Sequence, residues 1–376
     1  IRGMALAALT GDAKWPPLLL DAETTYAVAG DASVVVGARG QVRLPDQADA
    51  LGPFEVTVRR NADGLRFEGL QVNTVPVSLA GIITVGEDRS WSLEMKEATL
   101  RNQGITWLVE RAPAIPVTVK DGVPAEATMS AVRLGADPAG GFTFSKGAIT
   151  VKDVGIRLNG GYEIEGIEGA ISVENDVYQL SGFSNRHVEA DGAMTLDYVS
   201  DTVGLNLTGK LNLSPDFPLP DAVSSVLRAE AGTVTIPEFQ ATFVQGNIQL
   251  SALRIAASLV EGAVSAYDRS ARTYGPATEV AGEGVFEDGA LHITRIVGSQ
   301  TKFSGTLTPD ETLQRWTVAS TFTSELSSPL WEFVQPAGVT FQRGKLDCTR
   351  LDGVFARGQK KPESLQVEAT ADGAGE

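Results

Sequence analysis

The sequence predicts an all-β protein with a few short helices, forming an elongated, curved, mainly antiparallel sheet built from tandem repeats. Three observations predict this class: a hydrophobic period of two, apolar motifs that recur at a fixed interval, and a composition typical of strands joined by turns. The 376 residues are 43% hydrophobic and 21% charged, with 40 glycines and 18 prolines. This length exceeds one ordinary core, so it indicates two or three domains or one extended repeat array.

Long alternating strands are the first predicted elements. The run VGLNLTGKLNL, which begins at Val203, places its apolar residues on one face. These residues are Val203, Leu205, Leu207, Leu211 and Leu213. Similar runs begin at Trp91, where Leu93 lies in the apolar phase, and at Trp316. Strands with one apolar and one solvent-exposed face are typical of antiparallel sheets with few helices packed on them.

A second motif, in which apolar residues are spaced by two and then three positions, occurs three times. Its copies are Leu65, Phe67 and Leu70; Tyr178, Leu180 and Phe183; and Leu291, Ile293 and Ile296. Successive copies lie about 113 residues apart, which indicates an internal repeat. A step of three inside a period of two predicts a β-bulge, which keeps the same face inward and bends the strand. The same spacing over residues 149–156 and 248–255 predicts further bulges, and repeated bulges predict a curved sheet.

Each copy is followed by a glycine, a long strand and a short helix. The helices are predicted over Ile105 to Arg111, Asp221 to Glu230, and Pro329 to Gln335. The repeat units therefore cover residues 1–115, 116–231 and 232–340, and residues 341–376 form terminal strands and a disordered tail. Repeats that cannot close individually predict one continuous elongated sheet. The apolar-phase glycines Gly81, Gly209 and Gly305 either leave room on the inward face or mark kinks.

The charge balance excludes some partners. A net charge of −16 opposes binding to nucleic acid, whose affinity depends on Lys and Arg neutralising phosphates. The same charge opposes adsorption to an anionic bilayer through a polybasic patch, but it does not oppose an apolar cavity for lipid tails. Cys348 is the single cysteine, so the chain forms no internal disulfide, and the residue is interpreted as a small buried hydrophobe.

The sequence holds no recognisable catalytic constellation. His187 and His292 are the two histidines, and neither has neighbours that would complete a triad or a metal ligand set. Acidic residues such as Glu163, Glu165 and Glu168 alternate with apolar residues, as strand exteriors do. The chain is therefore predicted to be no enzyme and to need no metal or cofactor. A carboxylate pair from distant strands, as in a carbohydrate-active enzyme, stays open as a remote alternative.

Four segments carry a resemblance to a known family. They are DGLRFEGLQV from Asp63, DVYQLSGFSNRHVEADGAMTLDY from Asp176, LTGKLNLSPDF from Leu207, and DGALHITRIVGSQTKFSGTLT from Asp288. Over most of residues 54–335 the chain resembles the AsmA-like family, the bacterial relatives of bridge-like lipid-transfer proteins. Members usually carry an N-terminal membrane helix and are often longer. The chain begins with Ile1 and lacks such a helix, so it is interpreted as a segment of a longer protein.

The resemblance implies a β-sheet groove with an apolar interior. Such a groove conducts phospholipid or similar lipid across the periplasm toward the outer membrane, and a segment absent from this chain tethers it to the inner membrane. The partners implied are lipid acyl chains and envelope proteins of the inner and outer membranes. The family supplies no catalytic residues to carry over.

The groove candidates are the inward apolar residues of the predicted strands. They are Leu65, Phe67, Leu93, Leu180, Val203, Leu205, Leu207, Leu211, Leu213, Leu291 and Ile293. The same residues fit a second interpretation, in which they pack into a closed core between two sheets. A closed core would suit a structural or adhesive β-repeat module of the cell envelope that binds protein or glycan. The residues alone leave both interpretations open.

Overall fold

Antiparallel β-strands make up nearly all of the protein that the structure describes. This computed structural model describes residues 4–5, 19–28, 34–44, 49–61, 64–88, 90–109, 117–120, 124–136, 142–158, 163–197, 199–217, 227–268, 273–298, 300–310, 314–325, 344–356 and 362–372. Within these residues one α-helix and one 3₁₀ turn accompany the strands, and the strand pairs are antiparallel. The predicted all-β, antiparallel class is confirmed.

The chain divides into two units by its internal contacts. Unit 1 comprises residues 1–185, 191–204 and 243–247, and unit 2 comprises residues 186–190, 205–242 and 248–376. The division runs within β13 (Val188–Asp197), β14 (Thr202–Leu213) and β15 (Leu227–Val244). It leaves the predicted repeat boundaries untested.

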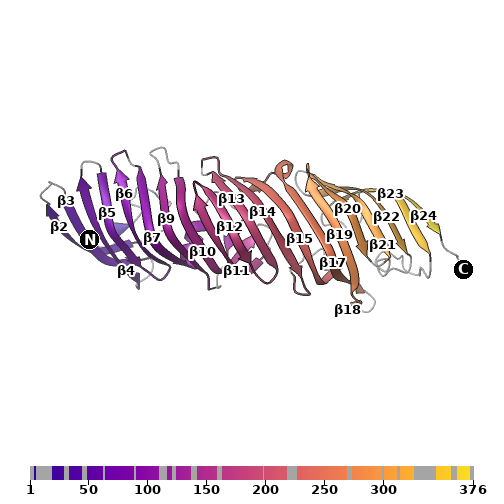
Figure 1. The fold of residues 1–376 in the computed structure, drawn as a ribbon, viewed down its shortest axis with the longest axis horizontal. Helices are drawn as coiled ribbons and strands as arrows, with labels where there is room; N and C mark the ends of the chain where they lie inside the picture. The colour runs from indigo at the N-terminus through magenta and orange to yellow at the C-terminus, as the bar shows by residue number, and fades with distance from the viewer. Residues whose placement is uncertain are drawn as a thin grey trace. The chain divides into compact units, whose positions relative to one another are not determined.

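Unit 1 is a meander in which successive strands are hydrogen-bonded neighbours. Its elements are β1 (Met4–Ala5), β2 (Leu19–Val28), β3 (Val34–Arg43), β4 (Ala50–Asn61), β5 (Gly64–Asn73), β6 (Val77–Gly86), β7 (Trp91–Arg101), α2 (Gln103–Val109), β8 (Val117–Val119), β9 (Glu126–Ala136), β10 (Phe142–Leu158), β11 (Glu163–Glu174) and β12 (Val177–Ser184). Pairing follows chain order from β1 to β7 and then passes to β9, β10, β11 and β12. The short strand β8 pairs with the end of β10. In Figure 1, β2 to β7 lie side by side at the indigo end of the chain.

Unit 2 continues the same construction. Its elements are most of β14 and β15, the end of β16 (Asn247–Ile248), η1 (Leu250–Ala252), β17 (Arg254–Asp268), β18 (Thr273–Tyr274), β19 (Thr278–Glu287), β20 (Ala290–Gly298), β21 (Thr301–Pro309), β22 (Arg315–Glu325), β23 (Lys345–Ala356) and β24 (Ser364–Asp372). β15 pairs with β17, β17 with β19, and each later strand with the next. The predicted alternating strands are present as β7, β14 and β22.

The three recurring motifs form bulges, as their spacing predicts. The registers of β5, β12 and β20 shift within the step of three residues that each motif contains. In β5 and β12 the extra residue is a glycine with positive φ, Gly69 at 58° and Gly182 at 62°. Glycine suits this place because a left-handed backbone costs it no Cβ clash. The predicted bulge over residues 149–156 also forms, with Asp153 at φ 53°.

Two predicted elements differ from the structure. Residues 248–255 do not form a bulged strand, because η1 turns the chain between β16 and β17 with the amide of Ala252 donating to the Gln249 carbonyl. The helix predicted over residues 221–230 is wrong for 227–230, which pair with β17 as the start of β15. Residues 221–226 and the predicted helix at 329–335 lie outside the described residues. The first predicted helix is present as α2, two residues earlier than expected.

The apolar-phase glycines mark close approaches of neighbouring backbones. A Cβ at Gly81 would lie 2.6 Å from the Glu94 carbonyl oxygen, and one at Gly305 would lie 2.7 Å from that of Ala319. At Gly209 the corresponding distance to the Glu189 oxygen is 2.3 Å. These glycines therefore lie where a neighbouring backbone leaves no room for a Cβ, which does not fit the interpretation as free space.

Candidate functional site: an apolar sheet face

Directly paired residues place the unit 1 candidates on one face of the sheet. Side chains directly opposite each other in an antiparallel pair point to the same face, so registers can be followed from strand to strand. One such row crosses β3 to β10 and contains Phe67 and Leu93. Its members are Val36, Val58, Phe67, Ile83, Leu93, Leu134 and Phe144. Every member of the row is apolar.

A second row on this face contains Leu180 and crosses from β2 to β12. Its members are Ala22, Gly40, Phe54, Val72, Leu79, Ala98, Met129, Ile149, Ile171 and Leu180. A third row, at the strand ends, holds Leu65 between Arg60 and Val85. These three rows and those parallel to them are called the apolar face of unit 1. Each bulge adds one residue to its strand, so the apolar residues before and after the bulge point to the same face. The apolar face therefore stays continuous across the bulges.

The apolar face of unit 1 combines buried side chains, such as Phe54, Met129 and Val132, with partly exposed ones. Phe67, Leu93 and Leu180 are half-buried, and Leu65 is 37% exposed. In a core closed between two sheets, side chains at the centre of the sheet would be buried from both sides. Among the described elements of unit 1, strands contact their sheet neighbours, and α2 adds contacts with β7 and β8. The buried members of the face fit a closed core and the half-buried members fit an open face, so both interpretations stay open.

One end of the face has a second layer. α2 packs beside β7 and β8, and its Ile105 is 5% exposed. Nearby, Ala98 and Ala127 are both 2% exposed. Asn102 ties this end together, since its side-chain oxygen accepts a hydrogen bond from the Ala125 amide at 2.9 Å. The helix thus covers one margin of the face.

Unit 2 has an apolar face of the same kind but with smaller side chains. The row through Leu291 consists of Phe239, Ile255, Phe286, Leu291, Leu307, Val318, Gly353 and Leu365. The row through Ile293 consists of Ala257, Gly284, Ile293, Gly305, Ser320, Leu351 and Val367. Leu291 and Ile293 are half-buried. Leu291 and Ile293 therefore both lie on the apolar face of unit 2.

The five candidates of β14 follow the predicted alternation. Val203 is buried at 1% exposure, whereas the four leucines Leu205, Leu207, Leu211 and Leu213 are half-buried. Asn206, Thr208 and Lys210 between them are exposed. β14 thus has one apolar face and one solvent-exposed face.

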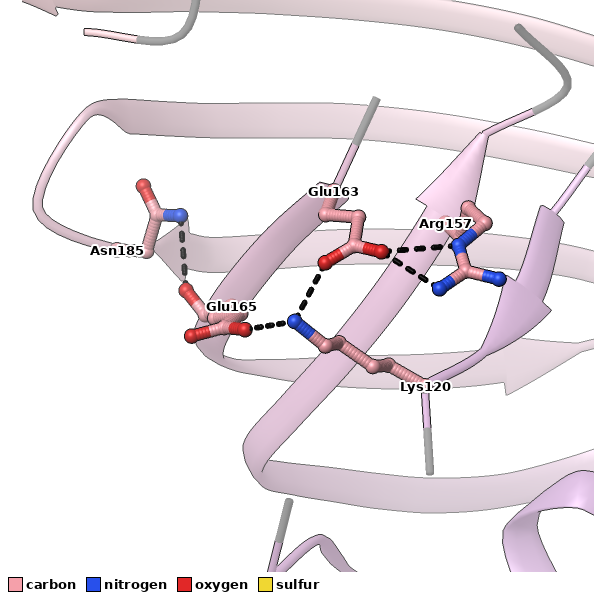
Figure 2. Close-up of polar contacts among 5 residues, drawn as sticks. All are labelled: Lys120, Arg157, Glu163, Glu165 and Asn185. Atoms are coloured by element: carbon pink, nitrogen blue, oxygen red, sulfur yellow. Dashed lines mark hydrogen bonds and ion pairs between the residues drawn. The ribbon is translucent and has the colours of Figure 1, made fainter. Parts of the chain in front are cut away.

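The opposite face of unit 1 is polar, and cross-strand ion pairs cover it. Figure 2 shows one cluster, in which Lys120 lies between the carboxylates of Glu163 and Glu165. Arg157 donates to Glu163 Oε1 through Nε at 3.0 Å and Nη2 at 2.6 Å. The hydrogen bond from Lys120, with that from Arg157, holds the pKa of Glu163 below its ordinary value. A general acid for glycoside hydrolysis needs a raised pKa, so this cluster does not suit that chemistry.

The histidines have structural surroundings. His292 is exposed, with its ring Nδ1 3.3 Å from the Thr306 hydroxyl. His187 is buried against Phe217, with ring centroids 5.5 Å apart and Nε2 3.8 Å from Asp216 Oδ2. Within the described ranges, no three His, Cys, Asp or Glu residues meet as a metal site. Cys348 is buried, as predicted.

The sequence-based candidates are all apolar, and they leave out one charged residue of this face. Arg60 lies directly opposite Val34 on one side and Leu65 on the other. The sequence contains a signal for this position. Phe54, Val56 and Val58 precede Arg60 at steps of two, so the alternation of the strand places Arg60 on the same face as these apolar residues.

Comparisons with family models, curated proteins and solved structures give no match for this chain. The AsmA-like family therefore stays a prediction from the repeat motifs. Among the helices that the structure describes, none is both long and apolar enough to span a membrane.

Proposed function

We propose that this chain is a non-enzymatic lipid-transfer segment whose apolar faces bind acyl chains and conduct phospholipid or a similar lipid. The observation that carries the proposal is the apolar face of unit 1, one of whose rows continues across ten strands with buried and half-buried side chains. Contiguous apolar surface that is partly exposed is typical of an interaction site. The proposed setting is the periplasm, with a tether to the inner membrane outside this chain and envelope proteins as further partners.

The energetics of lipid movement suit this face. Each acyl methylene is worth about 0.8 kcal/mol, so a tail of about fourteen carbons crossing water costs on the order of 10 kcal/mol. The row from Ala22 to Leu180 crosses nine strand spacings, and at about 4.8 Å per spacing it extends for about 40 Å. A tail on such a row meets a similar apolar surface after each shift by one strand. It can therefore slide along the sheet without a deep binding site.

The test is photocrosslinking from matched positions on the two faces. A photoreactive amino acid replaces Leu93, Leu180 or Ile293, and in control variants it replaces the preceding residue, Ser92, Gln179 or His292. After illumination with phospholipid vesicles, we expect lipid adducts at the three apolar positions, several-fold above those at the controls, when the protein is analysed by mass spectrometry. Equal labelling at both sets, or protein adducts without lipid, would overturn the proposal.

A further inference from the structure

Arg60 departs from the pattern of charges in unit 1. It is the one charged side chain in the cross-strand rows of the apolar face between β2 and β12, where its direct neighbours are Val34 and Leu65. Val34 is 40% exposed and Leu65 is 37% exposed. A cation therefore stands in water at the margin of an exposed apolar surface.

The other arginines of these strands lie in ion pairs across the polar face. The pairs are Arg39 with Glu23, Arg43 with Asp21, Arg59 and Arg66 with Glu68, Arg101 with Glu126, Arg133 with Glu94, and Arg157 with Glu163. Arg59 precedes Arg60 in the chain, and the alternation of the strand sends the two side chains to opposite faces. Arg59 Nε lies 3.9 Å from a Glu68 oxygen, which makes it a matched control.

We propose that Arg60 binds the anionic headgroup of an amphiphile whose tail lies on the apolar face of unit 1. This inference rests on the proposed function. A guanidinium donates two parallel hydrogen bonds to a carboxylate or phosphate, which suits an acidic head at the edge of an apolar surface. From Arg60 the tail can follow Val58 along β4 or Leu65 and Val85 across the strands. The ligand class is thus an amphiphile with one exposed anion, in preference to a neutral or zwitterionic one.

The test compares two amphiphiles with the same tail. Dodecyl phosphate and dodecylphosphocholine, both below their critical micelle concentrations, are titrated into the full chain and followed by calorimetry. An exposed ion pair is worth up to about 1 kcal/mol, so the wild type is expected to bind dodecyl phosphate about fivefold more tightly. Added salt should weaken this preference, because it screens exposed charges.

The variants separate this inference from the function on which it rests. Arg60→Gln should remove the preference and leave dodecylphosphocholine binding unchanged, Arg60→Lys should keep part of it, and Arg59→Gln should keep all of it. If the preference survives in Arg60→Gln, or is lost equally in Arg59→Gln, the headgroup site is overturned while acyl binding stands. If neither amphiphile binds the wild type, the proposed function fails together with this site.

Discussion

Two parts of the apolar face of unit 1 share the same alternation but differ in what covers them. Beside α2, Ile105 and Ala98 are buried, whereas Phe67, Leu93 and Leu180 elsewhere on the face are half-buried. The strands supply side-by-side packing in both parts, and among the described residues α2 adds a second layer at one margin. The side chains of a single sheet can therefore differ in burial according to what packs on them.

The largest expected effect comes from the closed margin. Ile105→Ala should lower the free energy of unfolding by about 2–4 kcal/mol, since it removes a buried side chain from the helix–sheet contact. Leu93→Ala should cost only about 1 kcal/mol, because the leucine is half-exposed before the change. Urea denaturation of the two variants measures the difference. A cost at Leu93 equal to that at Ile105 would show that a second layer covers the centre as well.

A smaller effect is expected at the bulges that keep the face continuous. Ala131 in β9 has φ 51°, a left-handed conformation that disfavours a side chain by about 1–2 kcal/mol. Ala131→Gly should therefore raise the midpoint of thermal unfolding, with a net stabilisation of about 0.5 kcal/mol after the backbone entropy of glycine is counted. Gly69→Ala is the converse control, since nothing lies within 4 Å of its added Cβ and only its φ of 58° opposes the change. A stabilising Gly69→Ala would contradict the assigned bulge geometry.

The smallest effect concerns the polar face and depends on pH. The pKa of Glu163 is lowered in the folded state by Lys120 and Arg157, so the unfolded chain takes up the proton first as pH falls. The stability from this cluster is therefore present above the unfolded pKa and is lost as pH falls through the folded one. Glu163→Gln should reduce the loss of stability as the pH falls from about 5 to about 3, measured by the urea concentration at the midpoint of unfolding. If the pH dependence of stability in this range is unchanged in Glu163→Gln, the exposed ion pairs contribute nothing measurable to the stability of the fold.

Much of the sheet was predictable because strand periodicity is a local property. The alternation in β7, β14 and β22 and the bulges in β5, β12 and β20 occur where their spacing predicts. Residues 227–230 and 248–255 were wrongly predicted, because an amphipathic spacing does not reveal the strand with which a segment pairs. β15 forms where the helix was expected since its residues hydrogen-bond to β17, which follows it in the chain.

By itself, the sequence determined the alternation of β7, β14 and β22 and the positions of the bulges in β5, β12 and β20. Only the tertiary structure decided that Arg60 stands among the apolar rows while Arg59 joins Glu68 across the sheet. It also decided that Gly81 and Gly305 serve close backbone approach, and that α2 covers one margin of the face. The physical reason is that side-chain direction follows from the backbone of each strand, whereas register and coverage depend on segments distant in the chain.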